Sequence, residues 1–184
     1  MNRYRLSLQP ETLVALRRLH TGIRSIAISP GHPRHPGCSA CYFETVTGDI
    51  VKILSESRDL EFKFEVFTLE AKLEAGPDDL NWELLDWVGP ITVTLLETDE
   101  WIESTARSGE AIGANPVEQI RDHLSRVPAT ASAACVYVGG IEVTNSEGGR
   151  LFLATGGFPL SLHVQGYAED PDVRIESYRH QSAA

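Results

Sequence analysis

The feature that most constrains the fold is the alternation of charged and apolar side chains in Glu61-Phe-Lys-Phe-Glu-Val66. A period of two residues is typical of a strand with one face in a core and the other in water. After Val66 the apolar residues change phase, since Phe67 and Leu69 are apolar at odd numbers. A shift of one residue sends side chains to the opposite face, so we expect a bulge or bend near Val66-Phe67.

This phase change makes an explicit prediction about burial. With a bulge, Phe64 and Leu69 are both buried, while Lys63 and Glu70 are both exposed. The alternative is a strand buried on both faces for a few residues. The charges at Glu65 and Glu70 make that alternative the less favoured one.

Further segments have strand-like patterns between polar or glycine-rich turns. They are Cys41–Thr47, Ile50–Ser55, Ile91–Leu96, Ala134–Thr144, Arg150–Thr155 and Leu160–Tyr167. Short turns at 145–149 and 156–159 join the last three, which predicts an antiparallel meander in the C-terminal half. The stretches 30–37, 75–89 and 104–114 look like loops.

Two segments have helical signals. Pro10 fits the start of a helix and Gly22 its end, which predicts an amphipathic helix over about residues 10–21. Asn115 fits an N-cap, with a proline and a glutamate at capping-box spacing after it, which predicts a second amphipathic helix over about 116–127. Strands outnumber helices and do not alternate with them. The predicted fold class is therefore α+β, with a predominantly antiparallel sheet and two helices.

Length and composition indicate an ordinary globular protein. A chain of 184 residues suits a single domain, 1–184, and is long enough to fold without metal or disulfides. The start lacks the apolar stretch of a secretory signal, and no later run reaches the length of a membrane span. Three cysteines are an odd number, which argues against a secreted disulfide scaffold. We therefore expect a cytoplasmic protein.

The net charge of -10 is unevenly distributed. Residues 49–103 hold four basic and fifteen acidic side chains, a balance of -11. Nucleic acid is disfavoured as a partner, because binding its backbone needs clustered Lys and Arg. Two interpretations stay open: a solvated acidic surface, or a contact surface for a basic protein. The candidate contact residues are Asp78, Asp79, Glu83, Trp82 and Trp87.

Four potential metal ligands, His32, His35, Cys38 and Cys41, follow one another at a spacing of three residues. Thiolates and neutral imidazoles are preferred donors for zinc, so zinc is the cofactor that this loop would hold. The two cysteines also have the spacing of a dithiol redox pair. A single knuckle is a weak signal, and an exposed Pro-Gly loop leading into a strand is the third interpretation.

No phosphate-binding loop, nucleophile elbow, zinc-protease helix or calcium loop is present in the sequence. Glu100 and Glu103 are too weak a pair to indicate a general acid and base. His163 cannot be assigned a role. The hypothesis we take forward is a non-enzymatic binding protein that uses the acidic segment 49–103. Its alternatives are a zinc protein and an enzyme with an unrecognised site. Homo-oligomerisation cannot be read from this sequence.

Overall fold

The computed structural model describes residues 2–31, 33, 37–60, 64–102, 133–156, 161–165 and 179–182. The chain groups into two compact units. The first contains Met1–Arg5 and Asp99–Val136, and the second contains Leu6–Thr98 and Tyr137–Ala184. The core and the sites discussed below lie in the second unit. No helix of the described residues is long and apolar enough to cross a membrane.

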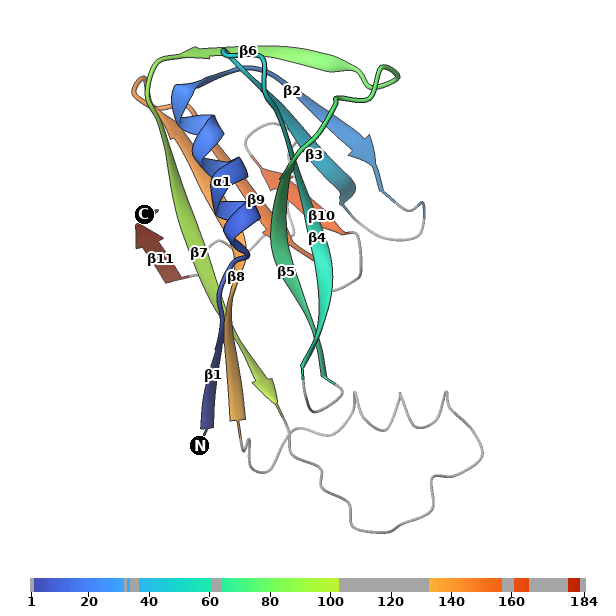
Figure 1. Cartoon of the computed structure of the whole chain (residues 1–184), viewed down its shortest axis with the longest axis vertical. Helices are drawn as coiled ribbons and strands as arrows, with labels where there is room; N and C mark the ends of the chain where they lie inside the picture. Colours follow the sequence, from blue (N-terminus) through green and yellow to red (C-terminus); the bar gives the residue numbers. More distant parts are fainter. Residues whose placement is uncertain are drawn as a thin grey trace. The chain divides into compact units, whose positions relative to one another are not determined.

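Strands dominate the described residues (Figure 1). They are β1 (Asn2–Leu6), β2 (Gly22–Pro30), β3 (Cys38–Thr45), β4 (Ile50–Leu60), β5 (Phe64–Leu73), β6 (Trp82–Val88), β7 (Ile91–Ile102), β8 (Ala133–Asn145), β9 (Arg150–Thr155), β10 (Leu162–Gln165) and β11 (Arg179–Ser182). One α-helix, α1 (Pro10–Arg18), continues as the 3-10 helix η1 (Leu19–Thr21). Pro10 supplies the fixed backbone angle of a first helical turn, and Gly22 ends the segment with φ +114°.

The predicted fold class is wrong in two respects. The described residues contain one short helix rather than two amphipathic ones, and the sheet is mixed, with parallel pairing. β1 pairs with β8, and Figure 1 shows the two strands running in the same direction. The predicted second helix, 116–127, lies outside the described residues. Parallel strands are connected by long segments rather than by short turns, so no turn motif in the sequence indicates that β1 and β8 pair.

The sheet branches at β3. Its order is β11-β7-β8-β9-β10-β3-β2-β6, while β4 also pairs with β3, and β5 pairs with β4. The first residue of β3 pairs with β10, and residues Cys41 to Glu44 pair with β4. β8, β9 and β10 form an antiparallel meander through the Ile141–Leu153 and Leu162–Thr155 registers. β3 therefore joins the meander to the β4–β5 hairpin.

The β4–β5 hairpin has no bulge near Val66-Phe67, so this prediction is wrong. Its strands pair residue for residue from Val51 with Leu73 to Leu60 with Phe64, without a register shift. Val66 and Leu69 are both buried although they lie on opposite faces, so the alternative of burial on both faces is the right one here. Glu70 was expected to be exposed, but its side chain is only 12% exposed because it pairs with Lys72, Nζ to Oε2 3.1 Å. The Lys63 and Phe64 side chains lie outside the described part.

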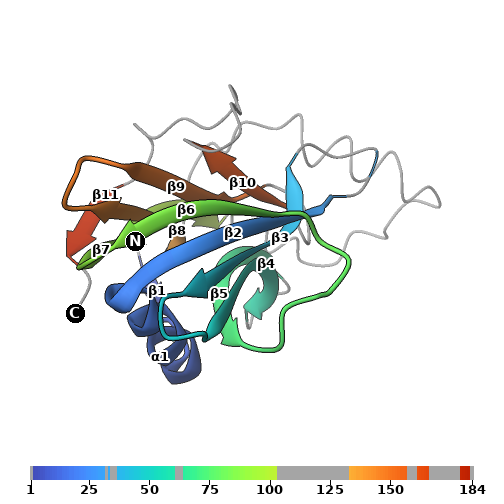
Figure 2. The ribbon, with the colours of Figure 1, turned by 90° about the horizontal axis from the view of Figure 1, so that it is seen from above.

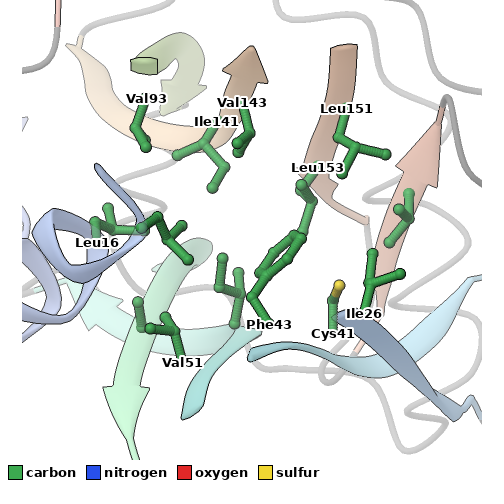
Figure 3. Close-up of a cluster of buried hydrophobic side chains, with 14 of the residues drawn as sticks. Leu16, Ile26, Cys41, Phe43, Val51, Val93, Ile141, Val143, Leu151 and Leu153 are labelled. Atoms are coloured by element: carbon green, nitrogen blue, oxygen red, sulfur yellow. The ribbon is translucent and has the colours of Figure 1, made fainter. Parts of the chain in front are cut away.

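The main core of the second unit lies under the curved sheet, between the β4–β5 hairpin and β8–β9 (Figure 3). Phe43 of β3 is fully buried at its centre, among aliphatic side chains of both parts of the sheet. Leu16 of α1 and Leu19 of η1 join the same core, and α1 packs against β5 (Figures 1 and 2). The helix thus covers the side of the core that the strands leave open.

Candidate binding surface

The segment 75–89, expected to be a loop, contains an edge strand. Trp82–Val88 forms β6 and pairs antiparallel with β2, with Leu84 beside Ser25 and Val88 beside Gly22. Within the described residues β6 has no second strand neighbour. The prediction of a loop over 75–89 is therefore wrong for residues 82–88, since charged residues are also common on an edge strand.

A bulge divides β6 near its middle. From Leu84 to Trp87 the strand advances three residues, while β2 advances only from Ser25 to Ile23. Asp86 lies in this extra step with φ +51°, a conformation that aspartate tolerates better than most residues. Leu85 and Trp87 pack against the main core on the inner face.

Leu84 and Val88 are the most exposed large apolar side chains of β6, at 73% and 74%. Their cross-strand neighbours on β2 explain this exposure. Gly22 has no side chain to cover Val88. Ser25 is small, and its hydroxyl donates to Glu44 Oε2 at 2.7 Å. Neither apolar side chain therefore has an apolar partner on the neighbouring strand.

Four acidic side chains lie on β6 or in the turn that precedes it. Asp78 and Asp79 are exposed in the turn before β6, and Glu83 and Asp86 are exposed on the strand. No ion pair involves any of the four within the part of the chain that the structure describes. We call these four acids together with Leu84 and Val88 the β6 surface.

Other acids of the 49–103 segment are neutralised by neighbouring cations. Lys52 Nζ lies 2.9 Å from Glu74 Oε1, and Asp49 Oδ2 lies 3.8 Å from Arg18 Nη1. The hydrogen bond to Glu74 raises the pKa of Lys52, which keeps the ammonium charged. Among the side chains that the structure describes in this segment, the acids without a cation partner therefore include all four of the β6 surface.

The two candidate tryptophans lie on opposite faces of β6. Trp82 packs edge-on against Tyr42, with ring centroids 6.5 Å apart and an interplanar angle of 65°. This pair belongs to a small outer cluster with Ala27 and Ala40. Trp87 packs against the main core instead. The two rings anchor β6 to the protein and do not form one common contact patch.

The His/Cys loop is described only at its end. His32 and His35 lie outside the described residues. Cys38 and Cys41 are buried in β3, and both side chains join the main core. A register shift adds one residue to β3 beside Ser29 and Pro30, which brings side chains three positions apart onto one face.

The chemistry of the two thiols favours their protonated forms. The Cys38 thiol donates to the carbonyl oxygen of Leu162 at 3.2 Å. Burial raises the pKa of Cys41 well above its usual value, and the nearby Cys38 raises it further. No group of three or more metal-binding side chains occurs among the described residues. The zinc hypothesis stays a prediction, and metal content of the purified protein would test it.

Sequence reasoning missed a pair of carboxyl groups on the β4–β5 hairpin. Glu56 and Glu70 lie diagonally across the two strands and share a hydrogen bond. This bond and burial raise the pKa of Glu56. Burial alone would raise the pKa of Glu70, but hydrogen bonds from Glu56 and Lys72 together lower it. Only the hairpin register could have identified the pair, because no local motif joins positions fourteen residues apart.

Ser161 and His163, at the start of β10, both lie close to Gly156. A side chain carbon added at Gly156 would lie 2.4 Å from Ser161 Oγ and 2.9 Å from His163 Nε2. Serine beside histidine is a combination that nucleophilic sites use. Ser161 is buried, however, so a substrate cannot reach it in this conformation. Of the carboxylate pair considered from the sequence, neither the Glu100 side chain nor Glu103 is among the described parts.

No family model, no curated protein and no solved structure matches the chain.

Proposed function

We propose that this chain is a non-enzymatic binding protein that contacts a basic protein partner through the β6 surface. One observation carries the proposal: β6 exposes two apolar side chains by more than 70%, and four exposed acids without ion pairs in the described region lie on the same strand or in the turn before it. Acidic side chains attract a cationic partner over about a Debye length, ~8–10 Å at ordinary salt. Removal of the apolar side chains from water in the contact then stabilises the complex.

A purely solvated acidic surface explains less. Charged side chains alone are sufficient for solubility, and exposed leucine and valine work against it. Exposed apolar side chains accompanied by polar or charged ones are the combination expected of a protein contact. Nucleic acid is disfavoured by the same negative charge. A cytoplasmic location, expected from the sequence, is part of the proposal.

The test compares two charge reversals of equal size. Glu83→Lys changes the β6 surface, while Glu11→Lys changes an exposed acid of α1. Each protein is immobilised and offered polylysine and a lysate of the source cell at low and high salt. We expect the first variant to lose about tenfold or more in association rate with polylysine at low salt, and to lose its specific partner.

The Glu11→Lys control should retain both partners, because Glu11 lies on α1, which packs against β5 and not against β6. Thermal unfolding of both variants confirms that the fold survives the changes. Equal losses in both variants would show that net charge, and not the β6 surface, attracts cations. A native protein that binds neither polylysine nor any lysate protein at low salt would refute the proposal.

A further inference from the structure

We infer that the partner binds as an extended segment that adds a strand to the free edge of β6, and that this segment alternates Lys or Arg with apolar residues. The inference rests on the proposed function and specifies the mode of binding and the chemistry of the partner. Strand addition uses the backbone groups of an edge strand for affinity and its alternate side chains for specificity.

The first argument concerns the backbone of β6. An edge strand directs half of its N–H and C=O groups away from its single neighbour. Here that neighbour is β2, and no other strand of the described residues pairs with β6. The opposite edge of this part of the sheet is different. There α1 covers β5, and the hydroxyl of Thr12 accepts a hydrogen bond from the Ala71 amide at 3.4 Å.

The second argument concerns the side chains. Leu84 and Val88 lie beside Ser25 and Gly22 of β2, on the outer face that also carries Trp82. A strand added at the free edge would place its own outer-face side chains directly against these two residues. Glu83 lies on the other face of β6, where the alternate side chains of the added strand would lie. Apolar residues on one face and cations on the other satisfy both sets of contacts.

The third argument excludes a second copy of this chain as the occupant. Antiparallel pairing of two β6 strands about their middle would bring Glu83 of each copy close to Asp86 of the other, and parallel pairing in register would bring each acid close to its own copy. Like charges on neighbouring strands destabilise the pairing. Charge complementarity therefore favours a basic segment from another protein over self-association.

The edge also lacks the full protection that natural edge strands carry. Charged residues and bulges commonly prevent unwanted pairing, and Glu83 and the bulge at Asp86 are such features. Leu84 and Val88 are not, since exposed apolar side chains promote pairing. The strand is thus selective: it repels a copy of itself and accepts a cationic strand.

Two peptides of identical composition test the inference. The first alternates, acetyl-Lys-Val-Lys-Val-Lys-Val-Lys-amide; the second has the same residues in blocks, four lysines followed by three valines. We expect the alternating peptide to bind at least about tenfold more tightly, because only it can place valines on one face and lysines on the other. Its binding should slow amide hydrogen exchange in residues 82–88.

Side-chain variants locate the binding. Leu84→Ser should weaken the alternating peptide about tenfold, since a large apolar contact is lost. The matched control is Val14→Ser, which removes an exposed apolar side chain of α1 and should leave the affinity unchanged. Equal affinity for both peptides, or unchanged exchange in β6, would overturn strand addition while leaving the proposed function in place. Failure of both peptides to bind the native protein would overturn both.

Discussion

The part of the sheet with the strand order β5-β4-β3-β2-β6 has two edges that differ in what lies beside them. At one edge, α1 packs against β5, places Leu16 in the main core and offers the Thr12 hydroxyl to the Ala71 amide. At the other, β6 pairs only with β2 among the described residues and exposes Leu84 and Val88. A covered edge contributes to stability because its apolar contacts are internal. At an open edge, the same kinds of contact are available to another molecule.

The comparison also shows that charge alone does not mark a surface as open. Acids on the β4–β5 hairpin are held by neighbouring lysines, as at Glu70 and Lys72. Acids around β6 have no such partners in the described region, so their charge is directed to solvent. The same residue type thus has a structural role at one edge and is available for contact at the other.

The largest expected effect is at the covered edge. Leu16→Ala should lower the free energy of unfolding by about 2–5 kcal/mol, because it leaves a cavity where α1 enters the core. Leu84→Ala is the matched control and should cost less than about 0.5 kcal/mol, since that side chain is already in water. Denaturant unfolding measures both. Similar losses at the two positions would mean that the edges do not differ as described.

A smaller effect should follow loss of the hydroxyl that faces β5. Thr12→Val keeps the shape of the side chain but leaves the Ala71 amide without its acceptor, at a cost of about 1 kcal/mol. Exchange of that amide with solvent should become faster. Thr21→Val removes an exposed hydroxyl that donates to the Arg18 carbonyl and serves as control. If the Ala71 amide exchanges at an unchanged rate, the helix does not protect this edge through Thr12.

The smallest effect concerns the carboxyl pair on the hairpin. The raised pKa of Glu56 stabilises the fold below the usual value of 4.5, and this contribution is lost as pH rises through the raised pKa. The lowered pKa of Glu70 acts oppositely: its contribution is present above 4.5 and is lost as pH falls through the lowered pKa. Together the two groups favour the native state most strongly between these pKa values.

Unfolding free energies measured from about pH 3 to about pH 8 test this pair. Glu56→Gln should remove the loss of stability on the alkaline side, since glutamine can still donate to Glu70 but does not ionise. Glu83→Gln, on the open edge, should leave that part of the profile unchanged. A wild-type profile without any decline above the usual glutamate pKa would contradict the shared hydrogen bond.

Much of the local structure was predictable from the sequence. Pro10 and Gly22 bracket the helical segment, and the turns at 145–149 and 156–159 predict the β8–β9–β10 meander because glycine and polar residues favour tight turns over continued strands. The excess of acids also indicated a candidate contact surface in the segment that contains β6. These signals are local: each depends on residues close together in the chain.

Predictions from the sequence were wrong where residues from distant segments determine the surroundings of a side chain. The phase change at Val66 resembled a bulge, but burial on both faces removes the need for one. Glu70 alternates like an exposed residue, but its carboxyl lies against Glu56 of the neighbouring strand β4, which the sequence does not indicate. The segment 75–89 resembled a loop until pairing with β2 made it a strand.

The sequence by itself determined a strand-rich globular chain with one N-terminal helix, and it located the excess of negative charge. Tertiary structure alone decided which edge of the sheet α1 covers, that Lys52 pairs with Glu74 across the hairpin, and that the side chains of Leu84 and Val88 are exposed. The physical reason is that period and turn chemistry act over a few residues, whereas burial and ion pairing depend on strand neighbours far apart in the chain.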